Sequence, residues 1–309
     1  MTIYESLPEA FPASETAVAL GIFDGLHLGH MAVIKTLVEI SQNERLAPCM
    51  FTFNTTTLRP AMKTGERLLS EAMRNKILEK TGIEYVLMPD FSQFRDMGPK
   101  DFSLFLTRYL NVKAVFCGED FRFGKGAKAN AADLKSFLDG LASVHIIKTV
   151  TALGSAISAT RIKRLLQEGD VAVANKLLGR PFSISAPVVR GRGIGHRHLL
   201  PTANQVYPEN FAVPRFGVYA SEAAASGRRY ASVTNIGVKP TVGGAPLLAE
   251  THIFDFSGDL YGEEITVTLL AFIRGEEKFD GLTALKAQME KDSVLAREIY
   301  SAYFAQVAE

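Results

Sequence analysis

The sequence has few cysteines and almost no net charge. Its 309 residues include only Cys49 and Cys117, and the formal net charge is +1. Two cysteines are too few for a disulfide framework or a zinc cluster, and both lie in apolar runs typical of strands, so we expect buried free thiols. Because there is no overall basic field, we expect no DNA or RNA partner.

Long hydrophobic runs are also absent. No stretch of about 18 apolar residues is present to cross a membrane. The N-terminal segment MTIYESLPEAFPASE is acidic and lacks a basic start and an apolar core, so it is not typical of a signal peptide. Hydrophobic residues make up 47% and charged residues 22%, an ordinary balance for a globular protein. We therefore expect a cytoplasmic protein, and the sequence leaves its oligomeric state open.

Apolar runs recur along the first half at intervals of roughly 30 residues, the spacing of βα units. Segments with helical spacing lie between them, at Met31–Val38 and Asp101–Leu110. This alternation predicts a parallel, doubly wound α/β sheet covered on both faces. The predicted strands are Val18–Leu20, Cys49–Phe53, Tyr85–Met88, Ala114–Cys117 and Val144–Ile147.

The pattern changes from Pro181 onward, where β-rich runs follow one another without helices between them. Gly and Pro punctuate the gaps, as in an antiparallel β-barrel. One amphipathic helix, about 281–304, closes the chain. Two helical patterns after Ser158 end at Gly179, a helix stop, which predicts domains at 1–180 and 181–309. The predicted barrel strands are Phe182–Val189, Gly217–Ala220, Tyr230–Ile236, Leu247–Phe254 and Ile265–Phe272.

The string GIFDGLHLGH, Gly21–His30, follows the first predicted strand and opens a helix. In a doubly wound sheet this position is the mouth of the ligand crevice. Helix N–H groups and the helix dipole attract phosphate, Gly29 permits close approach, and histidines add donors to oxygens that gain charge. His27 and His30 could instead be ordinary turn residues or metal ligands, although no third ligand stands out nearby.

The string RGRGIGHRH, Arg190–His198, is a glycine-rich cationic loop containing Gly191, Gly193 and Gly195. Glycines let the backbone fold around phosphates, and arginines offset their charge. It is not a Walker loop, because no Gly-Lys-Ser/Thr follows. Taken alone, such a stretch could also be a mobile surface loop.

The first half resembles the nucleotidyltransferase half of the prokaryotic bifunctional riboflavin kinase/FAD synthetases. Besides Gly21–His30, two further family strings are present: GEDFRFG at Gly118–Gly124 and SATRIK at Ser158–Lys163. The resemblance implies that Asp120 lies near the flavin. The residues it implies for ATP binding and catalysis are Gly21, Phe23, Asp24, Gly25, His27, Gly29, His30, Ser158, Thr160 and Arg161. Taken alone, Ser158 and Thr160 could be an N-cap pair, with Arg161 in a solvated first turn.

The second half resembles the riboflavin kinases. The matching strings are PTAN at 201–204, NIGVKPT at 235–241, ETHIFDF at 250–256 and DLYG at 259–262. The resemblance implies that Thr202 and Asn204 coordinate Mg²⁺ and nucleotide phosphates, and oxygen ligands of this kind suit magnesium. It also makes Glu250 the base that deprotonates the riboflavin 5′-hydroxyl, although alone it could be a solvated strand-edge residue. Arg274 falls in a segment that contacts the flavin ring in the family.

The chain departs from the family pattern in three places. A Pro-His-Pro sequence is expected after the second strand, but Asn54–Pro60 contains no histidine. Ala159 stands where the third string has a second serine. Leu199 and Leu200 replace Gly-Phe before PTAN, and we expect Leu199 to weaken the kinase step.

The sequence therefore predicts an α/β doubly wound FMN adenylyltransferase domain, followed by an antiparallel β-barrel riboflavin kinase domain with a C-terminal helix. We expect ATP and Mg²⁺ to serve both reactions, with riboflavin, FMN and FAD as substrates and products. Three alternatives remain open. They are a monofunctional FAD synthetase whose kinase-like half only binds flavin, a flavin sensor, and a nucleotidyltransferase for another phosphorylated substrate.

Overall fold

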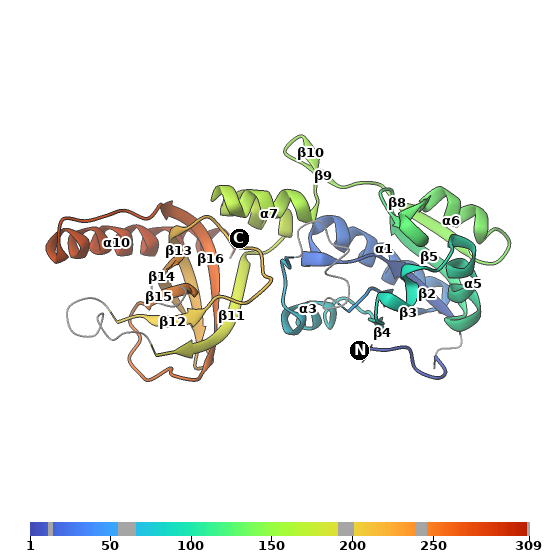
Figure 1. The fold of residues 1–309 in the computed structure, drawn as a ribbon, viewed down its shortest axis with the longest axis horizontal. Helices are drawn as coiled ribbons and strands as arrows, with labels where there is room; N and C mark the ends of the chain where they lie inside the picture. The colour runs from blue at the N-terminus through green and yellow to red at the C-terminus, as the bar shows by residue number, and fades with distance from the viewer. Residues whose placement is uncertain (12–14, 55–65, 191–200, 239–245, 308–309) are drawn as a thin grey trace. The chain divides into compact units, whose positions relative to one another are not determined.

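A computed structural model describes residues 1–11, 15–54, 66–190, 201–238 and 246–307 (Figure 1). The chain forms two compact units, Met1–Ala159 and Thr160–Glu309. No helix within the described ranges is long and apolar enough to cross a membrane.

The first unit is built on a six-stranded parallel sheet, as predicted. Successive residues of its second strand face opposite sides of the sheet. Ala17 and Ala19 pack with α1 (Leu28–Glu44) and α3 (Glu71–Leu78), whereas Val18 and Leu20 pack with the helices on the other face. Those helices are α5 (Pro99–Tyr109) and α6 (Ala131–Phe137). The strand order is β1 (Thr2–Tyr4), β4 (Tyr85–Leu87), β3 (Ala47–Phe51), β2 (Thr16–Leu20), β5 (Val112–Gly118) and β8 (Ser143–Ile147).

Both cysteines are free and buried in this sheet, which confirms the prediction of buried thiols. Cys49 lies in β3 and Cys117 in β5. Burial raises the pKa of the Cys49 thiol well above its usual range and that of Cys117 to about 12. Both thiols are therefore protonated at neutral pH and serve as small apolar core groups.

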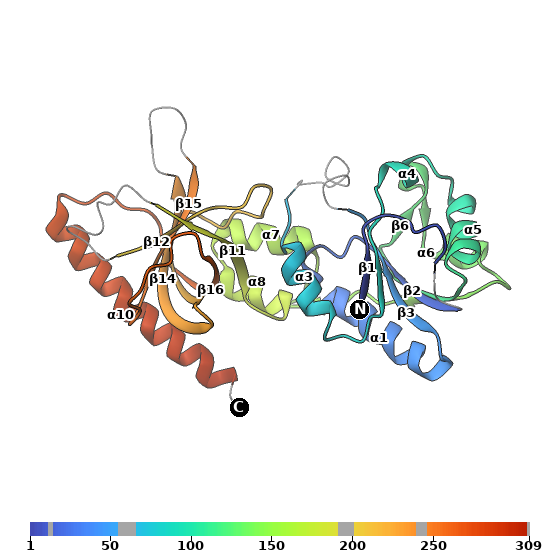
Figure 2. The same ribbon diagram turned by 90° about the horizontal axis from the view of Figure 1, so that it is seen from below.

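The second unit contains a closed six-stranded barrel in which every strand pairs antiparallel to its neighbours. The predicted barrel and C-terminal helix are confirmed. The strand at Ala203–Val206, β12, was not predicted. Helix α10 (Leu282–Val307) packs its Ala296 against Ala220 and Phe254 on the outside of the barrel (Figure 2). The strand order is β11 (Phe182–Val189), β12 (Ala203–Val206), β15 (Leu247–Ile253), β14 (Arg228–Val238), β13 (Gly217–Ala225) and β16 (Glu264–Arg274).

Helices α7 (Ala159–Glu168) and α8 (Val171–Leu178) precede the barrel, and α8 ends at Gly179, as predicted. Buried Asn175 joins α8 to two strands. Its amide nitrogen donates to the Leu269 carbonyl at 2.9 Å, and its amide oxygen accepts the Phe182 N–H at 2.8 Å. These bonds group α8 with the barrel, so the second compact unit begins about one helix pair before residue 180.

Replacing Asn175 with alanine should destabilise the second unit. The substitution leaves a buried N–H and a buried carbonyl without their partner, which costs about 1–3 kcal/mol. Urea denaturation of Asn175→Ala should show the lower unfolding free energy, whereas Gln167→Ala, at an exposed position on α7, should match the wild type. Equal stability of Asn175→Ala and wild type would mean that α8 is not held to the barrel by this residue.

Candidate functional sites in the two units

The turn after β2 has an irregular backbone that brings its side chains together. Phe23 has φ 53° and Gly25 has φ 81°, on either side of Asp24 in the short 3-10 turn η1 (Asp24–Leu26). The positive φ at Gly25 suits a residue without a Cβ. The buried Phe23 ring packs edge-on against His30, with ring centroids 5.3 Å apart. The chain therefore passes directly from this turn into the N-terminus of α1.

The two predicted histidines lie together at the start of α1. His27 is the N-cap, and its Nδ1 accepts the backbone N–H of His30 at 3.3 Å. Their rings stack with centroids 3.7 Å apart and planes at 16°. Because Nδ1 of His27 accepts a hydrogen bond, a neutral ring carries its proton on Nε2, where it is a donor. A Cβ at Gly29 would lie 3.1 Å from Cε1 of His27, so a glycine here lets the imidazole lie against the first helical turn.

Two charged residues connect this turn to α3. Asp24 Oδ1 accepts the backbone N–H of Leu68 at 2.9 Å. Arg74, which the sequence analysis did not single out, is only 5% exposed and lines a small cavity with Phe23, Asp24 and Gly25. Its Nη2 lies 2.6 Å from the Met88 sulfur, and burial lowers its pKa. The cavity beside the turn is therefore bordered by a buried cation.

The other two family strings also reach this edge of the sheet. β2 and β5 are parallel neighbours, so their carboxyl ends meet at one edge, where Gly118 ends β5 and Asp120 is exposed. A Cβ at Gly29 would lie 3.8 Å from the Ile157 carbonyl oxygen, which brings the residue before Ser158 to the start of α1. The structure thus brings the first two strings together at this edge, and the residue before the third string lies at the start of α1.

Several predicted residues belong elsewhere. Thr160 and Arg161 lie in the first turn of α7, which belongs to the second unit. The segment after Asn54 lies outside the described residues, as does the glycine-rich loop with Gly191, Gly193, Gly195, Leu199 and Leu200. Asn54 itself donates its backbone N–H to the Pro89 carbonyl at 3.1 Å.

In the barrel, the strand register places Glu250 between two asparagines. Glu250 of β15 is the direct partner of Asn204 on β12 and of Asn235 on β14. Directly paired residues point to the same face of a sheet, with Cβ atoms about 5 Å apart. The half-buried carboxylate of Glu250 is therefore flanked by the amides of Asn204 and Asn235. Asn235 lies in the string NIGVKPT, but the sequence analysis did not name it as a site residue.

The PTAN segment is fixed by its own hydrogen bonds. The Nδ2 of Asn204 donates to the Thr202 carbonyl at 3.2 Å, and Nδ1 of His252 donates to the Pro201 carbonyl at 2.8 Å. The first bond orients the Asn204 amide and leaves its oxygen as an acceptor next to the Glu250 strand position. The side chains of Asn204, Thr202 and Glu250 offer oxygen atoms as metal ligands, and oxygen ligands suit a hard cation such as Mg²⁺.

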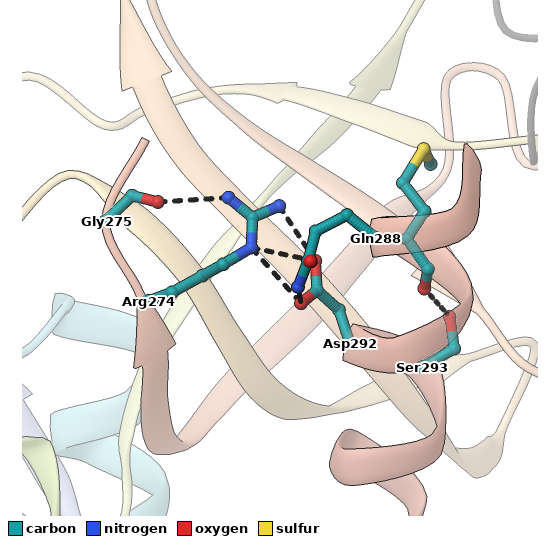
Figure 3. Close-up of polar contacts among 6 residues, drawn as sticks. Arg274, Gly275, Gln288, Asp292 and Ser293 are labelled. Carbon is teal, nitrogen blue, oxygen red and sulfur yellow. Dashed lines mark hydrogen bonds and ion pairs between the residues drawn. The ribbon is translucent and has the colours of Figure 1, made fainter. Parts of the chain in front are cut away.

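Arg274, predicted to lie at the flavin, ends β16 and forms a buried ion pair with Asp292 of α10 (Figure 3). The two side chains are 15% and 4% exposed. Within the parts of the chain that the structure describes, no cluster of His, Cys, Asp and Glu side chains offers three ligands to a metal ion.

Comparison with protein-family models gives two matches that together span most of the chain. Residues 11–161 match the model described as FAD synthetase, and residues 178–300 match the model described as riboflavin kinase. The first match ends inside α7, at residue 161, and the second begins at residue 178, the last residue of α8.

Three bacterial proteins, each described as a bifunctional riboflavin kinase/FMN adenylyltransferase, are similar along nearly their whole length. The Listeria monocytogenes protein is 33% identical, with 92% of each chain covered. The Bacillus subtilis protein is 34% identical with 93% of each covered, and the Escherichia coli K12 protein is 34% identical with 94% of each covered.

One solved structure has a similar fold over nearly its whole length. It is a crystal structure described as a macrolide-efflux protein from Streptococcus pneumoniae. The two chains are 30% identical with a TM-score of 0.86, and the match covers 96% of this chain and 98% of that one.

Proposed function

This chain belongs to the family of bifunctional riboflavin kinase/FMN adenylyltransferases and has both activities, and on that premise we propose which of its residues carry each reaction. It phosphorylates riboflavin to FMN with ATP and joins FMN to the AMP part of a second ATP, giving FAD. The observation that carries the assignment is that each unit gathers its own polar groups, His27 and His30 at the start of α1 in one and Asn204 and Glu250 on paired strands in the other.

We propose that the turn at Gly21–Gly25 and the start of α1 hold the triphosphate of ATP. The first N–H groups of a helix have no intrahelical acceptor, and together with the helix dipole they attract phosphate. Gly29 keeps the approach open, and the Nε2 donor of His27 adds to these N–H groups. Buried Arg74 supplies positive charge to the adjacent cavity. The family resemblance also gives Ser158, Thr160 and Arg161 a role in binding phosphate and places Asp120 toward the flavin.

Adenylyl transfer at this site needs no covalent enzyme intermediate. A phosphate oxygen of FMN attacks the α-phosphorus of ATP, the bond from that phosphorus to the bridging oxygen breaks, and pyrophosphate leaves. Negative charge increases on the departing oxygens, so preorganised donors lower the barrier. His27 and His30 are such donors, because stacking and the N-cap bond already fix their rings.

In the second unit we propose Glu250 as the general base. Its carboxylate accepts the proton of the riboflavin 5′-hydroxyl as that oxygen attacks the γ-phosphorus of ATP and ADP leaves. Thr202 and Asn204 would hold Mg²⁺, which neutralises phosphate charge when bound. Gly191, Gly193 and Gly195 would wrap the nucleotide phosphates.

The functional boundary near residue 180 is also a proposal. It is supported by the start of the riboflavin kinase match at residue 178. Helices α7 and α8 group with the barrel by contact, whereas α7 carries Arg161 of the adenylyltransferase string. We propose that both reactions take place in the cytoplasm.

Replacing both His27 and His30 with alanine should abolish FAD formation while leaving FMN formation intact. Losing preorganised donors of this kind costs about 10²–10³ in rate. Chromatographic separation of flavins after incubation with FMN and ATP measures the loss. The control His145→Ala removes a histidine of β8 that stacks on Phe116, and it should retain activity. Unimpaired FAD synthesis in the double variant would exclude the phosphate role.

Replacing Glu250 with glutamine should stop riboflavin phosphorylation and spare adenylyl transfer. The amide keeps the shape of the side chain but cannot accept the proton, and loss of a general base costs about 10²–10⁴ in rate. FMN formation from riboflavin and FAD formation from FMN are measured in parallel. Glu298→Gln, on the exposed side of α10, serves as the control. If Glu250→Gln loses both activities, the residue has a structural role instead.

A further inference from the structure

Arg274 and Asp292 form the most completely bonded ion pair of the second unit's described residues (Figure 3). Nη2 of Arg274 lies 2.8 Å from Oδ2 of Asp292, and Nε lies 3.1 Å from both carboxylate oxygens. Gln288, one helical turn before Asp292, donates to Oδ1 at 2.9 Å. Two elements far apart in sequence, the end of β16 and the middle of α10, are thus joined by a charge pair shielded from water.

Stability alone gives little reason for such a pair. Removing two charges from water costs about as much as their attraction returns, and apolar residues of similar volume are often equally good or better in such positions. Further along α10, Ala296 packs with Ala220 and Phe254 in an apolar cluster, and Ile273 and Ile299 lie against them. Arg297 of α10 also pairs with Asp255, but both of those side chains are exposed. The buried position of the pair between Arg274 and Asp292 therefore points to a positional role.

The pair holds the segment that connects β16 to α10. Nη1 of Arg274 donates to the Gly275 carbonyl at 3.0 Å, and the guanidinium carbon lies 5.4 Å from the ring centroid of half-buried Phe279. One arginine, with its charge fixed by Asp292, therefore orients both the start of the segment and the aromatic ring near its end.

Two glycines show how closely this segment lies on the barrel. A Cβ at Gly217 of β13, where φ is 145°, would overlap the Arg274 carbonyl oxygen. A Cβ at Gly237 of β14 would overlap the carboxylate of Glu276. The backbone contact at Gly217 requires a residue without a Cβ, whereas at Gly237 the exposed Glu276 side chain could move aside. The segment therefore crosses the ends of both strands.

The strand register connects this end of the barrel to the proposed kinase site. Arg274 pairs with Val218, and Val218 pairs with Asn235. Asn235 in turn pairs with Glu250. The ladder shifts register between Val218 and Tyr219, which explains how consecutive residues Ile273 and Arg274 both reach α10. Arg274 and Glu250 therefore lie three strands apart in one row of paired residues.

We propose that Asp292 is a positioning residue for riboflavin phosphorylation. Through Arg274 it fixes segment 274–279 as a wall at the end of the row that contains Glu250, and it turns one face of Phe279 toward the guanidinium. The wall sets where the flat aromatic ring of riboflavin lies relative to the base. The inference rests on the proposed role of Glu250 in the second unit.

Steady-state kinase assays of Asp292→Asn in the full-length protein test this role. We expect the KM for riboflavin to rise roughly tenfold, because a displaced wall misplaces the substrate. The KM for ATP and the rate of FAD formation from FMN should stay within about twofold of wild type, since neither depends on this wall. The matched control Glu290→Gln changes an exposed carboxylate two residues away on α10 and should leave every parameter unchanged.

A second variant separates positioning from stability. Arg274→Met with Asp292→Leu replaces the pair by apolar residues and should restore the thermal stability of the second unit. If Asp292 positions the wall, the KM for riboflavin stays raised in this stable double variant, because Gly275 and Phe279 have lost their partner. A wild-type KM in the double variant, or in a folded Asp292→Asn, would overturn the proposal. A wild-type protein without kinase activity would overturn the proposed function as well, which distinguishes the two failures.

Discussion

Backbone hydrogen bonding between strands decides which side chains meet in both units. In the first unit, parallel pairing of β2 with β5 brings the end of each strand to one edge, where the turn at Gly21–Gly25 and the segment after Gly118 lie. In the second unit, antiparallel pairing sets Asn204, Glu250 and Asn235 in one row. A slip of one residue would turn each of these side chains to the opposite face. The chemistry therefore depends on register, which the buried faces of each sheet enforce.

In the proposed function, the two units handle phosphate by different physical means. The first relies on a helix N-terminus, where backbone N–H groups and two stacked imidazoles are already oriented before substrate arrives. The second relies on oxygen side chains along strands, a donor set for a hard cation beside a carboxylate base. The difference follows from the bonds that are made and broken. In adenylyl transfer, the attacking phosphate oxygen of FMN is already ionised. In riboflavin phosphorylation, the attacking 5′-hydroxyl must lose a proton.

Periodicity predicted the architecture well because both units bury strong apolar patterns. Five of the six strands of the sheet and the barrel class followed from apolar runs, such as Ala114–Cys117, which is buried in the structure. β1 was missed because Thr2–Tyr4 is a three-residue edge strand with one fully apolar residue. β12 was missed because its sequence, ANQV, is short and half polar; buried Gln205 donates to the carbonyls of Ala186 and Ile265.

Residues whose importance depends on tertiary contact could not be found from local patterns. Arg74 looks like a solvated helix residue until the fold places it beside Asp24 in a cavity. Asp292 lies 18 positions from Arg274, and their contact needs both the irregular β13–β16 ladder and the docking of α10. Family strings, by contrast, identified Glu250 and Asn204, which the register then placed side by side.

In the proposed function, the two reactions use separate sites, and the only link they need is FMN released into solution. Mixing two variants, each inactive in one reaction, tests this separation. The His27→Ala/His30→Ala protein and the Glu250→Gln protein are incubated with riboflavin, ATP and Mg²⁺, first separately and then together, and the flavins are separated by chromatography. Neither variant alone should make FAD, and the mixture should make it, because FMN from the first protein is adenylylated by the second. No FAD from the mixture, with FMN accumulating, would contradict the claim.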